Sequence, residues 1–237
     1  SSQLGEAQAL IGRALQLCRE TLSTEDYTEE EIEVELGVLT AQAAYVDQCM
    51  GEEDSAMKAY EALASFKSEL DPAVAAVSGN NMVALRGHIN LFDSWKKCKA
   101  NLSDGLAKKL TARQRHTFHF NAALLQMLMN KPDGCRELVK SLEQAHPSSD
   151  GPVLIRAALL HRAKQPKQCE DLLEEAVAKA ATPTAALTLA QLQLQSKDTA
   201  KALATLKRIT ALQQTPAMVG TLVALHERIG DVDGAVA

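Results

Sequence analysis

The chain has few aromatic residues, no long apolar run and no paired cysteine motif. Of its 237 residues, 46% are hydrophobic but only 3% are aromatic, so alanine and leucine supply most of the apolar mass. This composition favours packed helices over sandwiches and barrels, where aromatic and β-branched residues are enriched. No stretch approaches the roughly 20 apolar residues that a membrane-spanning helix needs. We therefore expect an all-α protein without a membrane span.

The sequence also lacks the common motifs of active sites. It has no glycine-rich phosphate loop and no GxSxG nucleophile elbow. His116 and His119 are three residues apart, a spacing that zinc sites sometimes use, but no HExxH pattern or nearby cysteine set accompanies them. We expect a protein that is not an enzyme and that uses no metal or cofactor.

Small residues recur at a nearly constant spacing in the C-terminal half. One set of evenly spaced positions consists of Cys135, Cys169, Ala202 and Ala235. A second set precedes the first by twelve residues each time and consists of Ala123, Ala157, Ala190 and Val223. Both sets follow the period of tetratricopeptide repeats, which are two-helix units of about 34 residues. The pattern therefore predicts a repeat protein.

Two antiparallel helices approach closely only where both carry small side chains, so each pair of positions twelve apart marks a helix crossing. Ala44 and Ala56 repeat the pattern upstream. Each helix pair must stack on its neighbours to bury its apolar stripe. We expect an α-solenoid of tetratricopeptide repeats, a right-handed superhelix of helix pairs. We expect residues 1–237 to form one array, and because helices at both ends lack partners, a slice of a longer one.

The five cysteines form an odd set without a CxxC pair, and the sequence starts without a basic and then apolar leader. These features predict reduced thiols and a cytoplasmic protein. Cys135 and Cys169 stand where other repeats place alanine, so we expect them to pack as small apolar side chains.

The repeat spacing is broken once. The interval from Ala56 to Cys135 is longer than two repeat periods, and the excess corresponds to about three helical turns of sequence. Glycine, asparagine and aspartate punctuate residues 87–103. We expect an irregular insertion at about 86–111, with a loop or distorted helix around Trp95. Upstream of it, we expect one helix from about Glu31 to Met50, with acidic residues in its first turn.

Charge is distributed unevenly along the chain. Residues 20–35 hold eight acids without Lys or Arg, and residues 86–116 hold eight basic residues against two acids. Solvated segments are one interpretation. Others are a contact between the two segments, or a basic patch that binds RNA or an acidic partner. The candidate residues of this patch are Lys96, Lys97, Lys99, Lys108 and Lys109.

The concave face of such an array is lined mainly by the first helix of each pair, and it suits a long partner segment held by apolar burial. Counting around these helices from the crossing positions gives mainly apolar and amide-bearing candidates, for which packing between repeats is the alternative. The candidate groove residues are Tyr45, Phe120, Asn121, Leu124, Met127, Leu154, Ala158, His161, Leu187, Gln191 and Leu194.

Several short segments, in order along nearly the whole chain, resemble the family of 72-kilodalton subunits of the eukaryotic signal recognition particle. They are Phe92-Asp93-Ser94 with Lys96-Lys97, Phe120-Asn121-Ala122-Ala123-Leu124-Leu125, Cys135-Arg136, Pro152-Val153-Leu154-Ile155, Ala190-Gln191-Leu192, Pro216-Ala217-Met218-Val219 and Asp231-Val232-Asp233.

The resemblance implies a tetratricopeptide array that grips a C-terminal segment of the particle's 68-kilodalton subunit. It also implies that the particle RNA is contacted mainly through regions outside this chain. The expected function is a non-enzymatic scaffold of a cytoplasmic ribonucleoprotein, with nucleolar assembly as an option, that supports co-translational targeting to the endoplasmic reticulum. Two alternatives stay open: RNA contact through residues 86–116, and a generic co-chaperone or adaptor.

Overall fold

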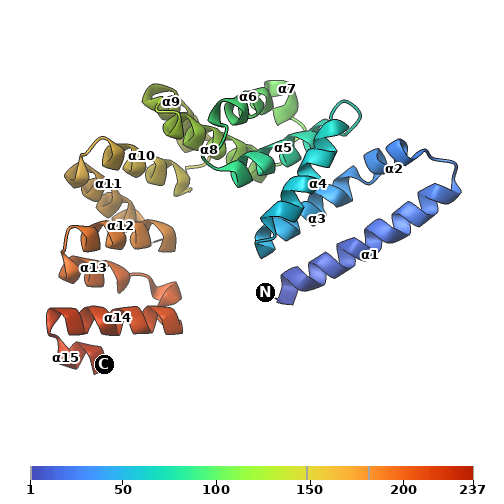
Figure 1. Cartoon of the computed structure of the whole chain (residues 1–237). Helices are drawn as coiled ribbons and strands as arrows, with labels where there is room; N and C mark the ends of the chain where they lie inside the picture. Colours follow the sequence, from blue (N-terminus) through green and yellow to red (C-terminus); the bar gives the residue numbers. More distant parts are fainter. Residues whose placement is uncertain (1, 148, 181, 237) are drawn as a thin grey trace. The chain divides into compact units, whose positions relative to one another are not determined.

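The computed structural model describes residues 2–147, 149–180 and 182–236, which form helices and connecting turns without a β-strand (Figure 1). The expectation of an all-α fold is confirmed. The N-terminal helices are α1 (Ser2–Thr24), α2 (Glu29–Glu35), α3 (Gly37–Met50), α4 (Glu53–Ser65), α5 (Pro72–Arg86), α6 (Leu91–Asn101), α7 (Asp104–Ala107) and α8 (Ala112–Leu128). The C-terminal helices are α9 (Pro132–Ala145), α10 (Gly151–Arg162), α11 (Pro166–Lys179), α12 (Pro183–Gln195), α13 (Thr199–Leu206), the 3₁₀ turn η1 (Thr210–Leu212), α14 (Pro216–Ile229) and α15 (Val232–Val236).

The chain divides into two compact units, one up to Cys135 and one from Arg136 onward. Within each unit, helices that follow one another pack side by side as hairpins, for example α3 with α4 and α12 with α13 (Figure 1). The first helices of neighbouring hairpins also touch, as α3 touches α5 and α10 touches α12. This is the packing expected of stacked two-helix repeats. That the whole chain forms one array stays a prediction.

Four of the five predicted pairs of small residues twelve apart are buried at helix crossings, and the fifth, Val223 and Ala235, is partly buried. Ala44 and Ala56 are both fully buried, and so are Ala123 and Cys135. In the next repeat the contact is direct, because the Cys169 thiol donates a hydrogen bond of 3.3 Å to the backbone carbonyl of Ala157. Ala190 and Ala202 are buried in the same way. The predicted crossing positions therefore locate the tight contacts of these hairpins.

The irregular repeat places two buried serines on its packed helices. Ser78 lies one repeat period after Ala44, and Ser94 follows Ser78 by sixteen positions instead of twelve. Both serines are buried, on the packed helices α5 and α6. Three of the four additional positions lie in α5, which continues for eight residues past Ser78, whereas α8, α10 and α12 end five residues past their crossing residues. The fourth lies in the turn at 87–90, whose ends Gly87 and Asn90 both have positive φ. The prediction of a loop or distorted helix at 87–103 is wrong for residues 91–101, which form the helix α6.

The helix predicted from Glu31 to Met50 is interrupted at Leu36. It begins two residues earlier, at Glu29, with a capping box, in which the backbone N–H of Glu31 donates to the Thr28 hydroxyl and the Glu31 carboxylate accepts from the Thr28 backbone. Acidic residues do occupy this first turn. The interruption directly precedes buried Gly37, where a Cβ atom would collide with the side chain of Leu70. Glycine lowers helix propensity there and admits Leu70.

Candidate partner-binding site

The N-terminal unit contains a hollow of about 570 Å³, formed by α1 and the first helices of successive hairpins. We call it the N-terminal hollow. Its lining residues are Ile11, Ala41, Gln42, Tyr45, Val46, Val77, Asn80, Asn81, Thr111, Arg113, Gln114, Thr117 and Phe118. Apolar side chains alternate with amides there, and Arg113 supplies a positive charge. Such a lining suits the backbone and apolar side chains of an extended peptide.

Tyr45, a predicted groove residue, lies in this hollow and is 50% exposed. A hydrogen bond with the thiol of Cys49 raises the pKa of Tyr45, and the nearby charge of Arg113 opposes this effect. A half-exposed tyrosine combines a large apolar ring with a polar tip, which is typical of residues that anchor a partner chain.

Asparagine side chains hold the floor of the N-terminal hollow in place. Asn121 donates a hydrogen bond of 3.1 Å to the side-chain oxygen of buried Asn80. Asn81 donates to the hydroxyl of Tyr60, which in turn donates to Gln48. The predicted residue Asn121 is therefore a support for a lining residue and is not itself part of the lining. Fixed amides give a ligand hydrogen-bond partners without further ordering costs.

The other groove candidates on α8 lie elsewhere. Phe120, Leu124 and Met127 are half-buried and are not among the lining residues of the hollow. The ring of Phe120 stacks on His116, with 6.3 Å between ring centroids and an interplanar angle of 16°. Their assignment to a partner groove stays a prediction.

The C-terminal unit contains its own hollow of about 400 Å³, between α10, α11 and α12. We call it the C-terminal hollow. Its lining includes four predicted groove residues, namely Leu154, Ala158, His161 and Gln191. Two further candidates on α12 do not line it: Leu187 is 43% exposed, and Leu194 packs against the core of this unit. Four of the six groove candidates predicted on α10 and α12 therefore line this hollow.

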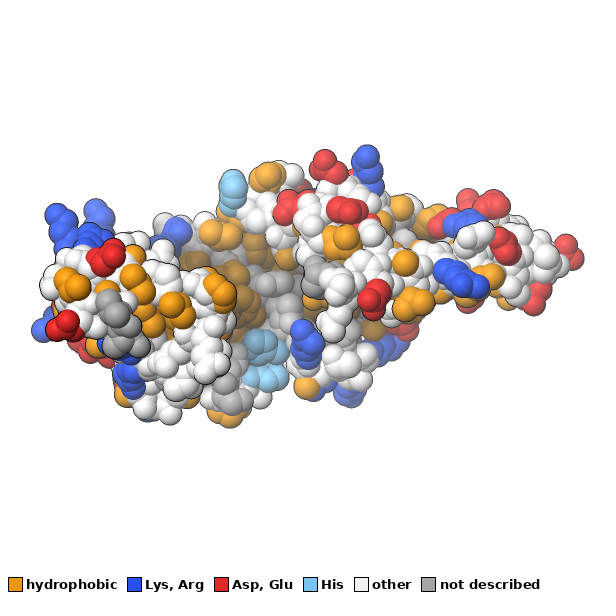
Figure 2. All heavy atoms as spheres, turned by 90° about the horizontal axis from the view of Figure 1, so that it is seen from below, with side chains coloured by type: hydrophobic (Ala, Val, Ile, Leu, Met, Phe, Trp, Pro, Cys, Tyr) orange, Lys and Arg blue, Asp and Glu red, His pale blue; other side chains and the backbone are white. Residues whose placement is uncertain are grey.

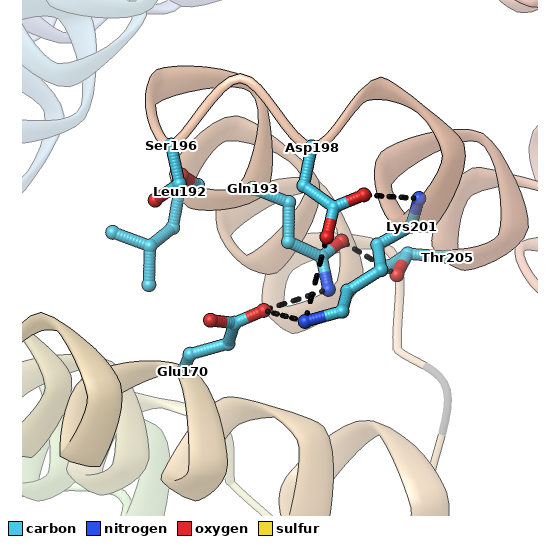
Figure 3. A network of polar contacts seen from close by, with 7 residues as sticks. All are labelled: Glu170, Leu192, Gln193, Ser196, Asp198, Lys201 and Thr205. Carbon is cyan, nitrogen blue, oxygen red and sulfur yellow. Dashed lines mark hydrogen bonds and ion pairs between the residues drawn. The ribbon is translucent and has the colours of Figure 1, made fainter.

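A polar network ties α11, α12 and α13 together beside the C-terminal hollow (Figure 3). Glu170 accepts hydrogen bonds from Gln193 at 3.5 Å and from the ammonium of Lys201 at 3.2 Å. The same carboxylate raises the pKa of Lys201, chiefly through this hydrogen bond. Thr205 donates to the other end of the Gln193 side chain. The network fixes α12, which carries Gln191, relative to the neighbouring helices.

The acidic segment 20–35 comprises the end of α1, the following turn and α2, and carboxylates gather there (Figure 2). Arg19 of α1 is bonded to Glu33 and, at 3.3 Å, to Glu29, and these carboxylates raise its pKa. Part of the acidic charge is thus compensated by the neighbouring helix. Both residues of each pair are at least partly exposed, so these ion pairs contribute little to stability.

The structure separates the basic candidates into two groups. One group is exposed and consists of Lys96, Lys99, Lys108 and Lys109. Lys97 is only partly exposed, and its ammonium lies 3.2 Å from the sulfur of Met82. Burial lowers the pKa of Lys97. Lys97 therefore does not belong to a flat basic surface.

Within the described ranges, no group of three or more His, Cys, Asp or Glu side chains is arranged to hold a metal ion. Helices long and apolar enough to cross a bilayer are also absent from the part of the chain that the structure covers.

Asn80, Asn81, Arg113 and Gln114 are lining residues that the sequence-based selection missed. A signal for the asparagines existed, since they follow Tyr45 by close to one repeat period. This signal is hard to find because the irregular repeat interrupts the spacing, so that positions cannot be counted back from the C-terminal crossing residues to the asparagines.

The chain is similar in sequence to known proteins. It is 35% identical to the signal recognition particle subunit SRP72 of Homo sapiens over 237 residues, which is 99% of this chain. The match covers 35% of the human protein, so the chain spans about a third of its length. No model of a protein family matches the chain.

Two solved structures share its fold at low sequence identity. A thermophilic tetratricopeptide protein of Thermus thermophilus matches 88% of this chain and 100% of its own, with a TM-score of 0.53 and 16% identity. The assembly chaperone of RpL4, Acl4, matches 93% of this chain and 97% of its own, with a TM-score of 0.55 and 13% identity. Over nearly its whole length, the chain therefore resembles one section of the signal recognition particle subunit SRP72, and its fold is that of tetratricopeptide-like helical repeats.

Proposed function

We propose that the chain is a non-enzymatic scaffold of the signal recognition particle that holds a C-terminal segment of the particle's 68-kilodalton subunit. One observation carries the proposal: a chain similar to SRP72 over 99% of its length presents two hollows, lined mainly by the first helices of its repeats. The assembly would act in the cytoplasm, with the nucleolus as a place of assembly, and would support co-translational targeting to the endoplasmic reticulum.

The chemistry of the two hollows supports a peptide ligand. The N-terminal hollow offers fixed amides and a half-exposed tyrosine, whereas the C-terminal hollow offers apolar side chains with His161 and Gln191. Burial of apolar ligand side chains contributes roughly 25 cal/mol per Å² before ordering costs. We expect a small number of anchors to dominate the affinity, with Tyr45 among them.

The test is calorimetric titration of the chain with a peptide that spans the C-terminal region of the 68-kilodalton subunit. We expect a one-to-one complex at tens of micromolar or tighter. Tyr45→Ala should weaken binding by about tenfold or more, as expected when an aromatic anchor is lost. The matched control is Tyr27→Ala, since Tyr27 is 41% exposed and is not among the lining residues of either hollow.

A second pair of variants tests the C-terminal hollow. His161→Ala should also weaken binding, while His88→Ala, an exposed histidine in the turn after α5, should not. Absence of heat and of a complex with the unmodified peptide would reject the proposal. An amidated peptide separates a further alternative, because an adaptor that recognises a terminal carboxylate would lose binding.

A second candidate function is RNA contact, which the surface of α6 favours. Phe92 is 73% exposed, and the exposed lysines Lys96 and Lys99 follow it at one and two helical turns. An exposed aromatic ring beside lysines is the arrangement with which proteins stack bases and pair phosphates. Filter binding to particle RNA across a salt series decides this candidate: Phe92→Ala should weaken retention, Lys58→Ala should not, and a flat salt response excludes it.

A further inference from the structure

A second, smaller pocket lies between α4, α5 and α6 of the N-terminal unit, and it shares no lining residue with the N-terminal hollow. Its free volume is about 50 Å³. A water molecule needs about 10–15 Å³ on this measure, so the space holds about three to five atoms the size of oxygen. The pocket is lined by Tyr60 and apolar parts of α4 and α5, by Ser78 and Asn101, and by two lysines, Lys67 and Lys97.

Two hydrogen-bond donors of this pocket, on Ser78 and Asn101, are available to a ligand. The hydroxyl of Ser78 is buried and has no hydrogen-bond partner. Asn101 uses one amide hydrogen on the carbonyl of Ala76, at 3.2 Å, and its second N–H remains. An unmade hydrogen bond of a buried hydroxyl costs about 1–3 kcal/mol, so native proteins usually satisfy such groups with water or a ligand.

The pocket is also positively charged. The ammonium of Lys97 has the Met82 sulfur, a weak acceptor, at 3.2 Å. Burial, followed by the charges of Arg86 and Lys67, lowers the pKa of Lys97, against smaller opposing effects of Asp93 and Glu61. Neither acid is among the lining residues, and Glu61 is paired with Arg86 at 3.6 Å.

We propose that this pocket binds a carboxylate, presented by an aspartate or glutamate side chain of a partner protein. Lys97 and Lys67 supply the charge, and Ser78 and Asn101 supply two further donors, so that both carboxylate oxygens have partners. Hydrogen bonds to an ionised group are shorter and about twice as strong as neutral ones. A carboxylate has three heavy atoms and matches the available space, whereas a phosphodiester with its flanking sugars exceeds it.

The probe for this site is N-acetylglutamic acid α-amide, titrated into the ¹⁵N-labelled chain at constant ionic strength. We expect saturable shifts of the backbone amides of Ser78 and Gly79, which line the pocket. Inorganic phosphate and chloride serve as parallel arms, and glutamine blocked in the same way is the uncharged control. Saturable shifts with the glutamate probe alone support the proposal.

Two variants make the assignment specific. Lys97→Met should abolish the saturable shifts, while Lys99→Met, an exposed lysine on the same helix, should leave them unchanged. Ser78→Ala should weaken the glutamate probe roughly fivefold to tenfold without lowering the stability of the chain, because it removes an unsatisfied hydroxyl. Shifts that grow linearly with probe concentration, or that persist in Lys97→Met, would overturn the proposal. Larger shifts with phosphate or RNA than with the glutamate probe would also overturn it. The same holds if no anion shifts these amides, since the pocket would then hold water only.

Discussion

Thr205 donates a hydrogen bond of 2.8 Å to the side-chain oxygen of Gln193, and both side chains are buried between α12 and α13. The bond spans twelve residues, the same separation as the crossing positions, and so it joins the two helices of one repeat.

Removal of this hydrogen bond should destabilise the C-terminal unit. Thr205→Val keeps the shape of the side chain but leaves the buried Gln193 oxygen unsatisfied, at a cost of about 1–3 kcal/mol. Urea unfolding followed by circular dichroism measures the loss. Thr221→Val is the matched control, since its exposed hydroxyl bonds only within its own helix, and its effect should stay within about 0.5 kcal/mol. An equal effect of both variants would contradict a role for the buried bond.

Two glycines should respond to alanine with opposite signs. Gly37→Ala places a methyl group against Leu70 and should destabilise the N-terminal unit by about 1–3 kcal/mol, as overpacking does. Gly12 of α1 has open space at its Cβ position, so Gly12→Ala should stabilise the chain by up to about 1 kcal/mol. Thermal unfolding of the two variants checks both signs.

Ionisation of the Tyr60 phenol should lower the free energy of unfolding at alkaline pH. Its side chain is fully buried, and burial raises the pKa of Tyr60 from 10.0 to about 12. The protonated phenol therefore stabilises the fold below pH 10, and this contribution, about 2–3 kcal/mol, is lost as the pH rises through 12.

Unfolding free energies measured between pH 9 and the onset of alkaline unfolding test this prediction. Tyr60→Phe should be less stable at neutral pH, because its hydrogen bonds with Gln48 and Asn81 are lost, but should show a flatter alkaline profile. Tyr27→Phe, which alters an exposed ring, should keep the profile of the unmodified chain.

The five cysteines should divide sharply in their reactivity. Cys18 and Cys49 are exposed, whereas Cys98, Cys135 and Cys169 are buried. Burial raises the pKa of the Cys98 thiol to about 11, and it also raises that of Cys169, so their thiolates are scarce at neutral pH. Mass spectrometry after maleimide labelling should find two modified thiols in the native chain and five in denaturant. Rapid labelling of a third native thiol would contradict the packing described for these residues.

The sequence predicts the helix crossings well because only small side chains fit there. A buried contact such as that between Cys169 and Ala157 constrains residue type at a fixed spacing, so periodicity alone finds it. The fold class follows from this pattern, whereas the resemblance to SRP72 follows from the ordered short segments, and both are confirmed.

The candidate site is predicted less completely. Counting around a regular helix correctly places Leu154 and Gln191 in the C-terminal hollow. The same count selects Leu194, one turn after Gln191 on the same helix, but Leu194 packs against the core. The orientation of a side chain near the border of a groove depends on the next repeat, which local spacing does not encode. Lys97 shows the same limit, because a basic run does not reveal which lysine a neighbouring helix covers.

Ser78 and Ser94 are both buried on packed helices, although they lie sixteen positions apart and the connection between their helices is longer than in regular repeats. The two helices of this repeat thus stay packed against each other although the turn that connects them is longer. The segment 87–90 is for this reason a natural place to insert an affinity tag or a fluorescent reporter, since added residues there would extend into solvent while the two helices keep their register.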